Sequence, residues 1–405
     1  MNKKFFIRTF GCQMNVRDSE VICGLLRTMN YELTTNAEEA DVIIFNTCSV
    51  RKHAEDKVWS ELGRFKCDKR YAISHKPIIG LVGCMAQAYK DKIFERAPWV
   101  DFVVGPSDIH KIPQIVEKIT NYKSQIKEGI PFELKIWEIE GNERPEEIYH
   151  TGFYQDKDHA YVIISEGCSN YCSYCIVPYV RGPLRNRDYK DILREIEEAV
   201  DKGITRITLL GQNVNAYISS AKLKAQSEKL KLKTQVSNNE INFINLLEMV
   251  NGIKGLKEFS FITSHPKDVS VDLFYAMAEC DKLKKHLHLP LQSGSDRILR
   301  LMNRGYTKKL YLDLVNKYRK IIKDGVLTTD IIVGFPTESE ADFQETYNLV
   351  KEIEFNAGFI FKYSPRPHTA AEKLPDDVCK EEKERRQKLV LDLQKKISLR
   401  KNEKK

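Results

Sequence analysis

Apolar and polar residues in the first hundred positions form one repeating pattern of short apolar runs and longer helical stretches. Three strand-like runs, KKFFIRTFGC, ADVIIFNTC and KPIIGLVGC, end at Cys12, Cys48 and Cys84. Each run is followed by a stretch that can form a helix: VRDSEVICGLLRTMN, VRKHAEDKVWSELGRFK and MAQAYKDKIFERA. Strands that alternate with helices in this way predict a parallel α/β sheet.

Three cysteines occupy equivalent positions at the ends of these strands. Loops that follow the carboxyl ends of parallel strands lie along one edge of a sheet, so Cys12, Cys48 and Cys84 are expected to meet there. We predict that their thiolates bind a metal cluster; the alternative is three separate buried cysteines. Cys23 lies inside a helical run and is expected in the core. No role is assigned to Cys67, Cys280 or Cys379.

A second repeating pattern begins near residue 150 and contains six strand-like runs. They read HAYVIISEG, ITRITLLG, LKEFSFIT, KHLHLP, VLTTDIIVG and NAGFIFKY. Helical stretches such as DYKDILREIEEAVDKG and SEADFQETYNLVKEIE lie between them. Six strand–helix repeats predict an incomplete (βα)6 parallel barrel, with active-site groups at the carboxyl ends of its strands. The expected domains are residues 1–145, residues 146–380, and a charged amphipathic helix with a basic tail over 381–405.

One segment inside the second pattern has little apolar periodicity. Residues 219–240, SSAKLKAQSEKLKLKTQVSNNE, are rich in Lys, Ser and Gln and are predicted to be an exposed insertion. Two interpretations stay open: a solvated insert, or phosphate contacts made by Lys222, Lys224, Lys229, Lys231 and Lys233.

Composition narrows the class of protein. A chain of 405 residues that is 42% hydrophobic and 30% charged is expected to form two or three globular domains. The formal net charge of +8 permits an RNA partner without requiring one. The apolar stretch near the N-terminus is too short for a signal peptide, and no run of eighteen apolar residues predicts a membrane span. A cytoplasmic protein with reduced cysteines is expected.

The stretch GCSNYCSYC at 167–175 places three more cysteines close together: Cys168, Cys172 and Cys175. A disulfide framework favours an even number in a small secreted chain, and a closed zinc site takes four ligands. Buried core cysteines do not cluster beside Gly, Ser and Asn. An iron–sulfur cluster held by three thiolates, with one iron open, fits best. The C-x3-C-x2-C spacing with Tyr174 is similar to that of radical S-adenosylmethionine enzymes, whose open iron binds the methionine part of the cofactor.

With both cysteine triads in view, the chain resembles the methylthiotransferases, radical S-adenosylmethionine enzymes with an added N-terminal cluster domain. The resemblance runs from about residue 3 to residue 400. It rests on GCQMN, NTCSVR, GCMAQ, GCSNYCSYCIVPYVRG, LLGQNVNAY, TSHP, LPLQSGSDRIL and DIIVGFPTE. GCQMN and NTCSVR are similar to the branch that acts on isopentenylated tRNA, known as MiaB.

This resemblance implies addition of a methylthio group to carbon 2 of N(6)-isopentenyladenosine at tRNA position 37. It implies two 4Fe-4S clusters with S-adenosyl-L-methionine. Cys168, Cys172 and Cys175 would hold the cluster that splits this cofactor into a 5′-deoxyadenosyl radical and methionine. The other triad would hold an auxiliary cluster that carries the sulfur, and a second cofactor molecule would supply the methyl group. The chemistry suits the target, because no side chain can activate that C–H bond.

Polar residues at the strand ends are weaker candidates for contacts to cofactor or adenine. They are Gln212, Asn213, Ser264, His265, Gln292, Ser293 and Asp330. A structural histidine at 265 and a backbone-orienting role for Asp330 are the alternatives. After the cysteine loop, Arg181, Arg185 and Arg187 are expected either to bind phosphate or to form a solvated basic loop.

The expected partners are the tRNA anticodon loop and an electron donor such as flavodoxin or ferredoxin, with no membrane and a monomeric state. The family normally ends in a small RNA-binding barrel called TRAM. Here only residues 368–405 follow Pro367, and they read as helix, so this barrel is absent or the chain is cut before it. Other functions stay open: methylthiolation of N(6)-threonylcarbamoyladenosine or of a ribosomal protein, a two-cluster electron carrier, and a zinc-stabilised RNA-binding module.

Overall fold

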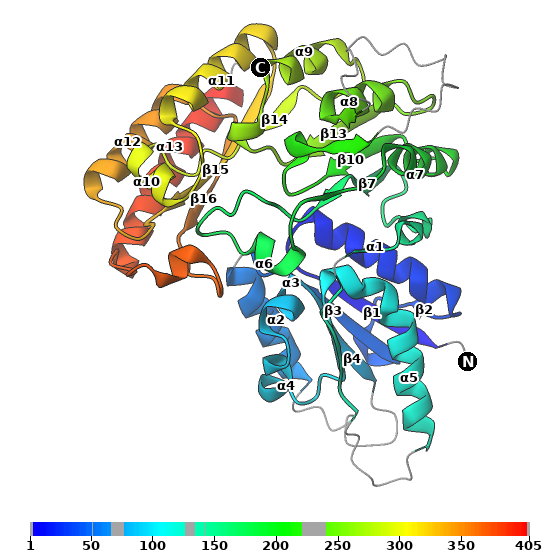
Figure 1. The fold of residues 1–405 in the computed structure, drawn as a ribbon. Helices are drawn as coiled ribbons and strands as arrows, with labels where there is room; N and C mark the ends of the chain where they lie inside the picture. The colour runs from blue at the N-terminus through cyan, green and yellow to red at the C-terminus, as the bar shows by residue number, and fades with distance from the viewer. Residues whose placement is uncertain are drawn as a thin grey trace. The chain divides into compact units, whose positions relative to one another are not determined.

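The computed structural model in Figure 1 describes residues 3–50, 52–65, 77–125, 134–141, 143–220 and 240–402. The chain divides into two compact units, Met1–Tyr161 with Val177–Gly182, and Val162–Ile176 with Pro183–Lys405. The division into domains 1–145, 146–380 and 381–405 stays a prediction. Cys67 and the five lysines of the insertion lie outside the described residues.

Unit 1 contains a six-stranded parallel sheet in the order β2-β1-β3-β4-β5-β6. The three predicted strands are present, lie side by side and confirm the parallel α/β expectation. The sequence pattern missed the others because each has only two or three residues. The strands are β1 (Lys4–Thr9), β2 (Glu32–Leu33), β3 (Val42–Thr47), β4 (Ile78–Gly83), β5 (Phe102–Val104) and β6 (Ile136–Glu138).

Helices cover both faces of this sheet, so every residue of β3 and β4 is buried. α2 and α4 share one apolar core with β3 and β4, whereas α1 packs with α5 on the other side (Figure 1). The single helix expected over 85–97 is two helices, because Lys90 has a left-handed φ of 52°. The helices are α1 (Gln13–Thr28), α2 (Lys52–Arg64), α3 (Cys84–Tyr89), α4 (Lys92–Arg96), α5 (Ile112–Gln125) and α6 (Val177–Arg181).

All six strands predicted for the second pattern are present, in two three-stranded sheets of order β13-β10-β7 and β14-β15-β16. Between them, Phe259 and Leu283 form an isolated parallel bridge. The arrangement is consistent with the expected incomplete barrel, interrupted where β14 is short. The strands are β7 (His159–Ile163), β10 (Arg206–Leu210), β13 (Glu258–Ile262), β14 (His286–His288), β15 (Val326–Val333) and β16 (Ala357–Lys362).

Two short antiparallel pairs close loops of unit 2. β8 (Ser165–Glu166) pairs with β9 (Arg185–Asn186), and β11 (Ile218–Ser220) pairs with β12 (Glu240–Asn242) at the base of the insertion. The expected C-terminal helix is α13, which packs on β16 and α12. Among the described helices, none is long and apolar enough to cross a membrane. The helices are α7 (Tyr189–Asp201), α8 (Phe243–Asn251), α9 (Val271–Glu279), α10 (Asp296–Leu301), α11 (Lys308–Ile321), α12 (Glu340–Ile353) and α13 (Lys380–Asn402).

Candidate functional site

The cysteines of unit 1 follow three neighbouring parallel strands. Cys12 caps the start of α1 after β1, Cys48 follows β3, and Cys84 begins α3 directly after β4. Gly11 allows the first loop to approach the second, because a Cβ at this position would lie 2.2 Å from the Cβ of Cys48. Its φ of +111° also favours glycine. The sheet therefore brings these loops to one edge, as the strand pattern predicts.

The three thiols influence one another electrostatically. A hydrogen bond from the Cys48 thiol lowers the pKa of Cys12 to about 6, against the opposing effect of burial. The same hydrogen bond raises the pKa of Cys48 well above its usual value, with burial adding to the rise. Burial raises the pKa of Cys84. Two of these cysteines are buried and Cys12 is partly exposed, and together they form a suitable donor set for iron.

A buried arginine contacts this triad. The Nε atom of Arg181 donates to the Sγ atom of Cys84 over 3.3 Å, and its Nη2 atom donates to Asp18 Oδ2 over 2.7 Å. Arg144 binds the other oxygen of Asp18 at 2.7 Å. Burial alone raises the pKa of Asp18, but the two arginines outweigh it and hold this pKa below its usual value. Neither sequence interpretation of Arg181 holds, because its side chain is neither solvated nor open to phosphate.

Asn15 fixes the loops around the triad and was not singled out from the sequence as a site residue. Its Nδ2 atom donates to the carbonyl oxygens of Phe10 and Thr47 at 3.0 and 2.8 Å. Its Oδ1 atom accepts from Arg181 at 3.3 Å and lies 3.6 Å from Cys12 Sγ. The stretch GCQMN, which carries Asn15, was the available signal.

The second triad lies in the loop that the β8–β9 pair closes in unit 2. Cys172 is buried, whereas Cys168 and Cys175 are partly exposed. The buried guanidinium of Arg304 donates from Nη1 to Cys172 Sγ over 3.3 Å. His265 Nε2 lies 3.9 Å from the same sulfur, and burial lowers the pKa of this histidine to about 2. A neutral imidazole and a buried cation therefore lie beside Cys172.

The turn that carries Arg304 also holds the cysteine loop in place. Ser173 bonds the carbonyl oxygens of Met302 and Leu301 through its N–H and hydroxyl groups, at 2.9 and 2.7 Å. Tyr174 packs against an apolar cluster that includes Met302 and Phe335. The aromatic residue before Cys175 therefore anchors the loop.

Apart from His265, the six other polar candidates fall into two groups. Four have a buried side-chain oxygen without a hydrogen-bond partner among the described residues: Gln212, Asn213, Ser264 and Gln292. They follow β10, β13 and β14, and β10 and β13 are parallel neighbours. Because buried polar oxygens normally have partners, these orphaned atoms indicate space for a polar ligand at the strand ends.

The other two polar candidates already have protein partners. The hydroxyl of Ser293 lies 3.3 Å from that of Thr346, and Asp330 Oδ2 lies 3.3 Å from His288 Nε2. Arg187 is likewise buried, bonding Asp191 and Glu195, so neither interpretation of this arginine holds. Arg185 is partly exposed and lies 3.5 Å from Glu166.

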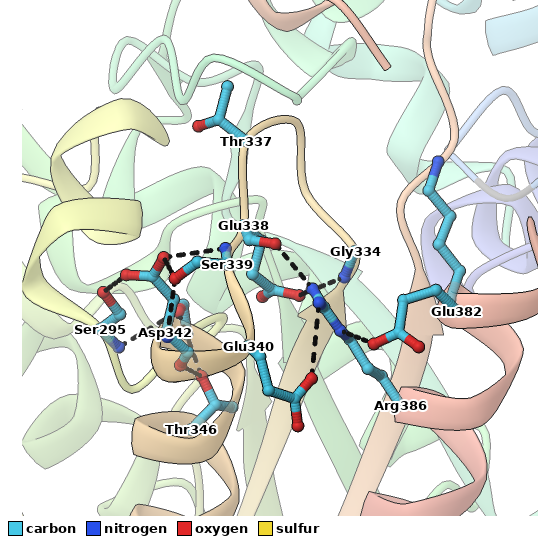
Figure 2. Close-up of polar contacts among 12 residues, drawn as sticks. Ser295, Gly334, Thr337, Glu338, Ser339, Glu340, Asp342, Thr346, Glu382 and Arg386 are labelled. Carbon is cyan, nitrogen blue, oxygen red and sulfur yellow. Dashed lines mark hydrogen bonds and ion pairs between the residues drawn. The ribbon is translucent and has the colours of Figure 1, made fainter. Parts of the chain in front are cut away.

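The loop after β15 is tied to the C-terminal helix by a buried ion pair. Figure 2 shows Arg386 of α13 reaching Glu338, with Nη1 at 2.8 Å from Oε2 and 2.9 Å from the backbone oxygen. The N–H of Gly334 donates to the same carboxylate at 2.6 Å. Asp342, in the first turn of α12, accepts from Ser295 at 2.6 Å. This network fixes one of the loops at the carboxyl ends of the strands.

These donor sets fit the clusters that the resemblance implies. Three cysteines follow β1, β3 and β4, three more lie in the loop between β8 and β9, and the strand ends provide buried oxygens without partners for a polar cofactor. Among the described residues, no three His, Cys, Asp or Glu side chains are arranged to bind one metal ion together. The ligands of a four-iron cluster need not converge on one ion, because each thiolate binds a different iron.

Two family models match the chain. Residues 4–105 match "Uncharacterized protein family UPF0004", and residues 162–350 match the radical SAM superfamily. Among solved structures, the chain is similar to the radical S-adenosylmethionine methyltransferase TsrM from Kitasatospora setae, with a TM-score of 0.58 and 11% identity. That match covers 92% of this chain and 75% of TsrM, and it shows a shared fold.

Sequence relatives match over nearly the whole chain. A tRNA-2-methylthio-N(6)-dimethylallyladenosine synthase of Clostridium botulinum is 45% identical, covering 92% of this chain and 76% of the relative. A synthase of the same name from Clostridium perfringens is 43% identical, covering 100% of this chain and 85% of the relative. The chain belongs to the family of tRNA-2-methylthio-N(6)-dimethylallyladenosine synthases, within the radical SAM superfamily.

Proposed function

We propose that this protein methylthiolates carbon 2 of N(6)-isopentenyladenosine, also called N(6)-dimethylallyladenosine, at position 37 of tRNA. The observation that carries this proposal is the identity of 43–45% to synthases of that name over 92–100% of the chain. The radical SAM match supports the chemistry, since an unactivated aromatic C–H bond requires a cofactor-borne radical.

The two triads have separate roles in this proposal. Cys168, Cys172 and Cys175 hold one 4Fe-4S cluster, and the cysteines at the ends of β1, β3 and β4 hold the other. When bound, the first cluster with S-adenosylmethionine supplies the radical, and the second supplies the sulfur. Arg304 holds the Cys172 sulfur in position through its Nη1 donor at 3.3 Å, and its buried positive charge would offset the negative charge of a bound cluster.

The orphaned polar oxygens are the proposed contacts to S-adenosylmethionine. Gln212, Asn213, Ser264 and Gln292 each offer an acceptor in a buried position, which suits the ammonium and hydroxyl donors of this cofactor. Asn213 is oriented by its amide, which donates to Asp268 over 2.6 Å. Ser293 and Asp330 stay weaker candidates, because their side chains already have protein partners.

Several partners follow from this chemistry. Reductive cleavage requires an external electron, so an electron donor such as flavodoxin or ferredoxin is part of the proposal. We propose that the enzyme acts on tRNA in the cytoplasm and that it acts as a monomer.

Variants of the two triads test the division of roles. The reconstituted protein should hold roughly eight irons, and either triple Cys→Ala variant should hold roughly four. The variant at Cys12, Cys48 and Cys84 should still release 5′-deoxyadenosine under reduction but transfer no sulfur. The variant at Cys168, Cys172 and Cys175 should release none.

The control measurement is iron and sulfide content of each variant. Complete loss of 5′-deoxyadenosine release from the N-terminal variant, with its remaining cluster fully assembled, would contradict the proposed roles. Cys23→Ala is a matched control, because this cysteine is buried in α1 away from the strand ends and should leave both iron and release unchanged.

A further inference from the structure

Arg181 contacts a cysteine of the N-terminal triad, although the proposed reaction assigns this residue no role. It ends α6, six positions after Cys175, and belongs to unit 1 with the N-terminal cysteines. Its Nε–H group donates to Cys84 Sγ over 3.3 Å, while Nη2 is held by Asp18 at 2.7 Å. The guanidinium is therefore fixed in place, with one edge on a carboxylate and another on a sulfur.

The contact extends to a second cysteine through Asn15. The Oδ1 atom of Asn15 accepts from Arg181 at 3.3 Å and lies 3.6 Å from Cys12 Sγ. Arg181, Asn15 and Asp18 are all buried, so solvent does not screen the charge. A planar guanidinium is suited to this double task, because its donors point in fixed directions.

Hydrogen bonds to cluster sulfurs are among the factors that set the reduction potential of an iron–sulfur centre. An added electron makes the cluster and its thiolates more negative, so a nearby N–H donor and positive charge stabilise the reduced state more than the oxidised one. We propose that Arg181 is a positioning residue that raises the reduction potential of the auxiliary cluster through its hydrogen bond to Cys84. This proposal rests on the proposed function, which places a cluster at this triad.

The test uses the full chain with Cys168, Cys172 and Cys175 replaced by Ala, so that only the auxiliary cluster contributes. The midpoint potential is measured by dithionite titration followed by electron paramagnetic resonance, with iron content determined on each sample. If this parent variant holds no iron, the proposed function fails at this triad, which is a separate result from failure of the Arg181 proposal.

Arg181→Met should make reduction about tenfold less favourable, a fall of about 59 mV for one electron. Arg181→Lys keeps the charge but cannot reach both Asp18 and Cys84, so an intermediate fall is expected. Arg144→Met is the matched control, because Arg144 binds the same carboxylate but touches Pro106 rather than a cysteine. Its potential should fall less than that of Arg181→Met, because a buried charge is lost while the N–H donor to Cys84 is kept.

An unchanged potential in Arg181→Met, or an equal fall in Arg144→Met, would overturn the proposal. If Arg181→Met loses its iron, Arg181→Lys decides: a lower potential supports the proposal and an unchanged one overturns it. Loss of iron from both Arg181 variants while Arg144→Met retains it also overturns the proposal, because Arg181 would then be needed to retain the cluster rather than to set its potential. Equal loss of iron from Arg181→Met, Arg181→Lys and Arg144→Met overturns the proposal, because the loss would then result from the unpaired charge of Asp18.

Discussion

Removal of Arg386 should destabilise unit 2 through the carboxylate that it leaves behind. Glu338 is 3% exposed and Arg386 is 5% exposed. Without the guanidinium, Glu338 keeps the N–H of Gly334 at 2.6 Å, and its Oε1 atom has no hydrogen-bond partner among the described residues. Breaking a buried ion pair by deleting one partner costs about 3–5 kcal/mol. Arg386→Ala is therefore expected to lower the free energy of unfolding by about this amount.

Urea titration can assign this loss to unit 2. The three tryptophans, Trp59, Trp99 and Trp137, all lie in unit 1. Their fluorescence follows unit 1, whereas circular dichroism follows the whole chain. With an m-value of about 3 kcal/mol/M, the dichroism midpoint should fall by about 1–2 M while the fluorescence midpoint stays unchanged.

Two further variants test whether the loss of stability in Arg386→Ala comes from the buried ion pair. Arg385→Ala removes the neighbouring arginine, whose half-exposed pairs with Glu340 and Glu382 should contribute about 1 kcal/mol at most. Glu338→Gln combined with Arg386→Met removes both charges and should recover most of the loss. Equal effects of Arg385→Ala and Arg386→Ala, or no recovery in the double variant, would refute the buried-pair account.

The loss should also depend on pH. Burial raises the pKa of Glu338, and Arg386 acts against this rise. Without Arg386, the pKa of Glu338 in the folded state lies further above its value in the unfolded chain. The charged form then costs stability once the pH exceeds the unfolded value, so the deficit should be large at pH 8 and smaller at pH 5. A deficit that is constant over this range contradicts the assigned cause.

Three further perturbations test other parts of the structure. Gly11→Ala should leave roughly four of eight irons, because a Cβ at this position would overlap Cys48. Gly63→Ala is the control and should keep all eight irons, because nothing lies within 4 Å of the added Cβ. Iron and sulfide assays distinguish the two variants. Arg304→Met should lose the cluster held by Cys168, Cys172 and Cys175, because Arg304 donates to Cys172. The same assays should show that the auxiliary cluster is retained. Hydrogen bonds outweigh burial and lower the pKa of Asp342, so this carboxylate stabilises the fold above about pH 4 and less below it. Asp342→Asn should flatten the fall in unfolding free energy between pH 5 and pH 3, and an unchanged slope would contradict this.

The apolar runs in the sequence correctly predicted the strands whose ends carry the cysteines and the polar candidate residues. The runs before Cys12, Cys48 and Cys84 became neighbouring strands, and this alone brought three distant thiols to one edge. All six barrel strands were present where their apolar runs predicted them. The break between the two sheets was not predictable, because β14 has only three residues and its run looks like the others.

Buried charges were the main failure of sequence reasoning. Arg181 and Arg187 follow a cysteine loop in a polar stretch, which suggested solvent or phosphate. Both arginines are instead buried against carboxylates. Asp18 lies 163 residues from Arg181, so no local sequence pattern shows this pairing. Arg187 pairs at helical spacing with Asp191, a signal that was present in the sequence but was read as part of a separate helix.

The central claim concerns one modified nucleoside, and mass analysis of tRNA from cells with and without the gene tests it most directly. The account predicts that deletion leaves N(6)-isopentenyladenosine without its 2-methylthio group, and that reintroducing the gene restores the group. If this nucleoside is unchanged while a methylthiolated threonylcarbamoyladenosine disappears, the proposed substrate is contradicted.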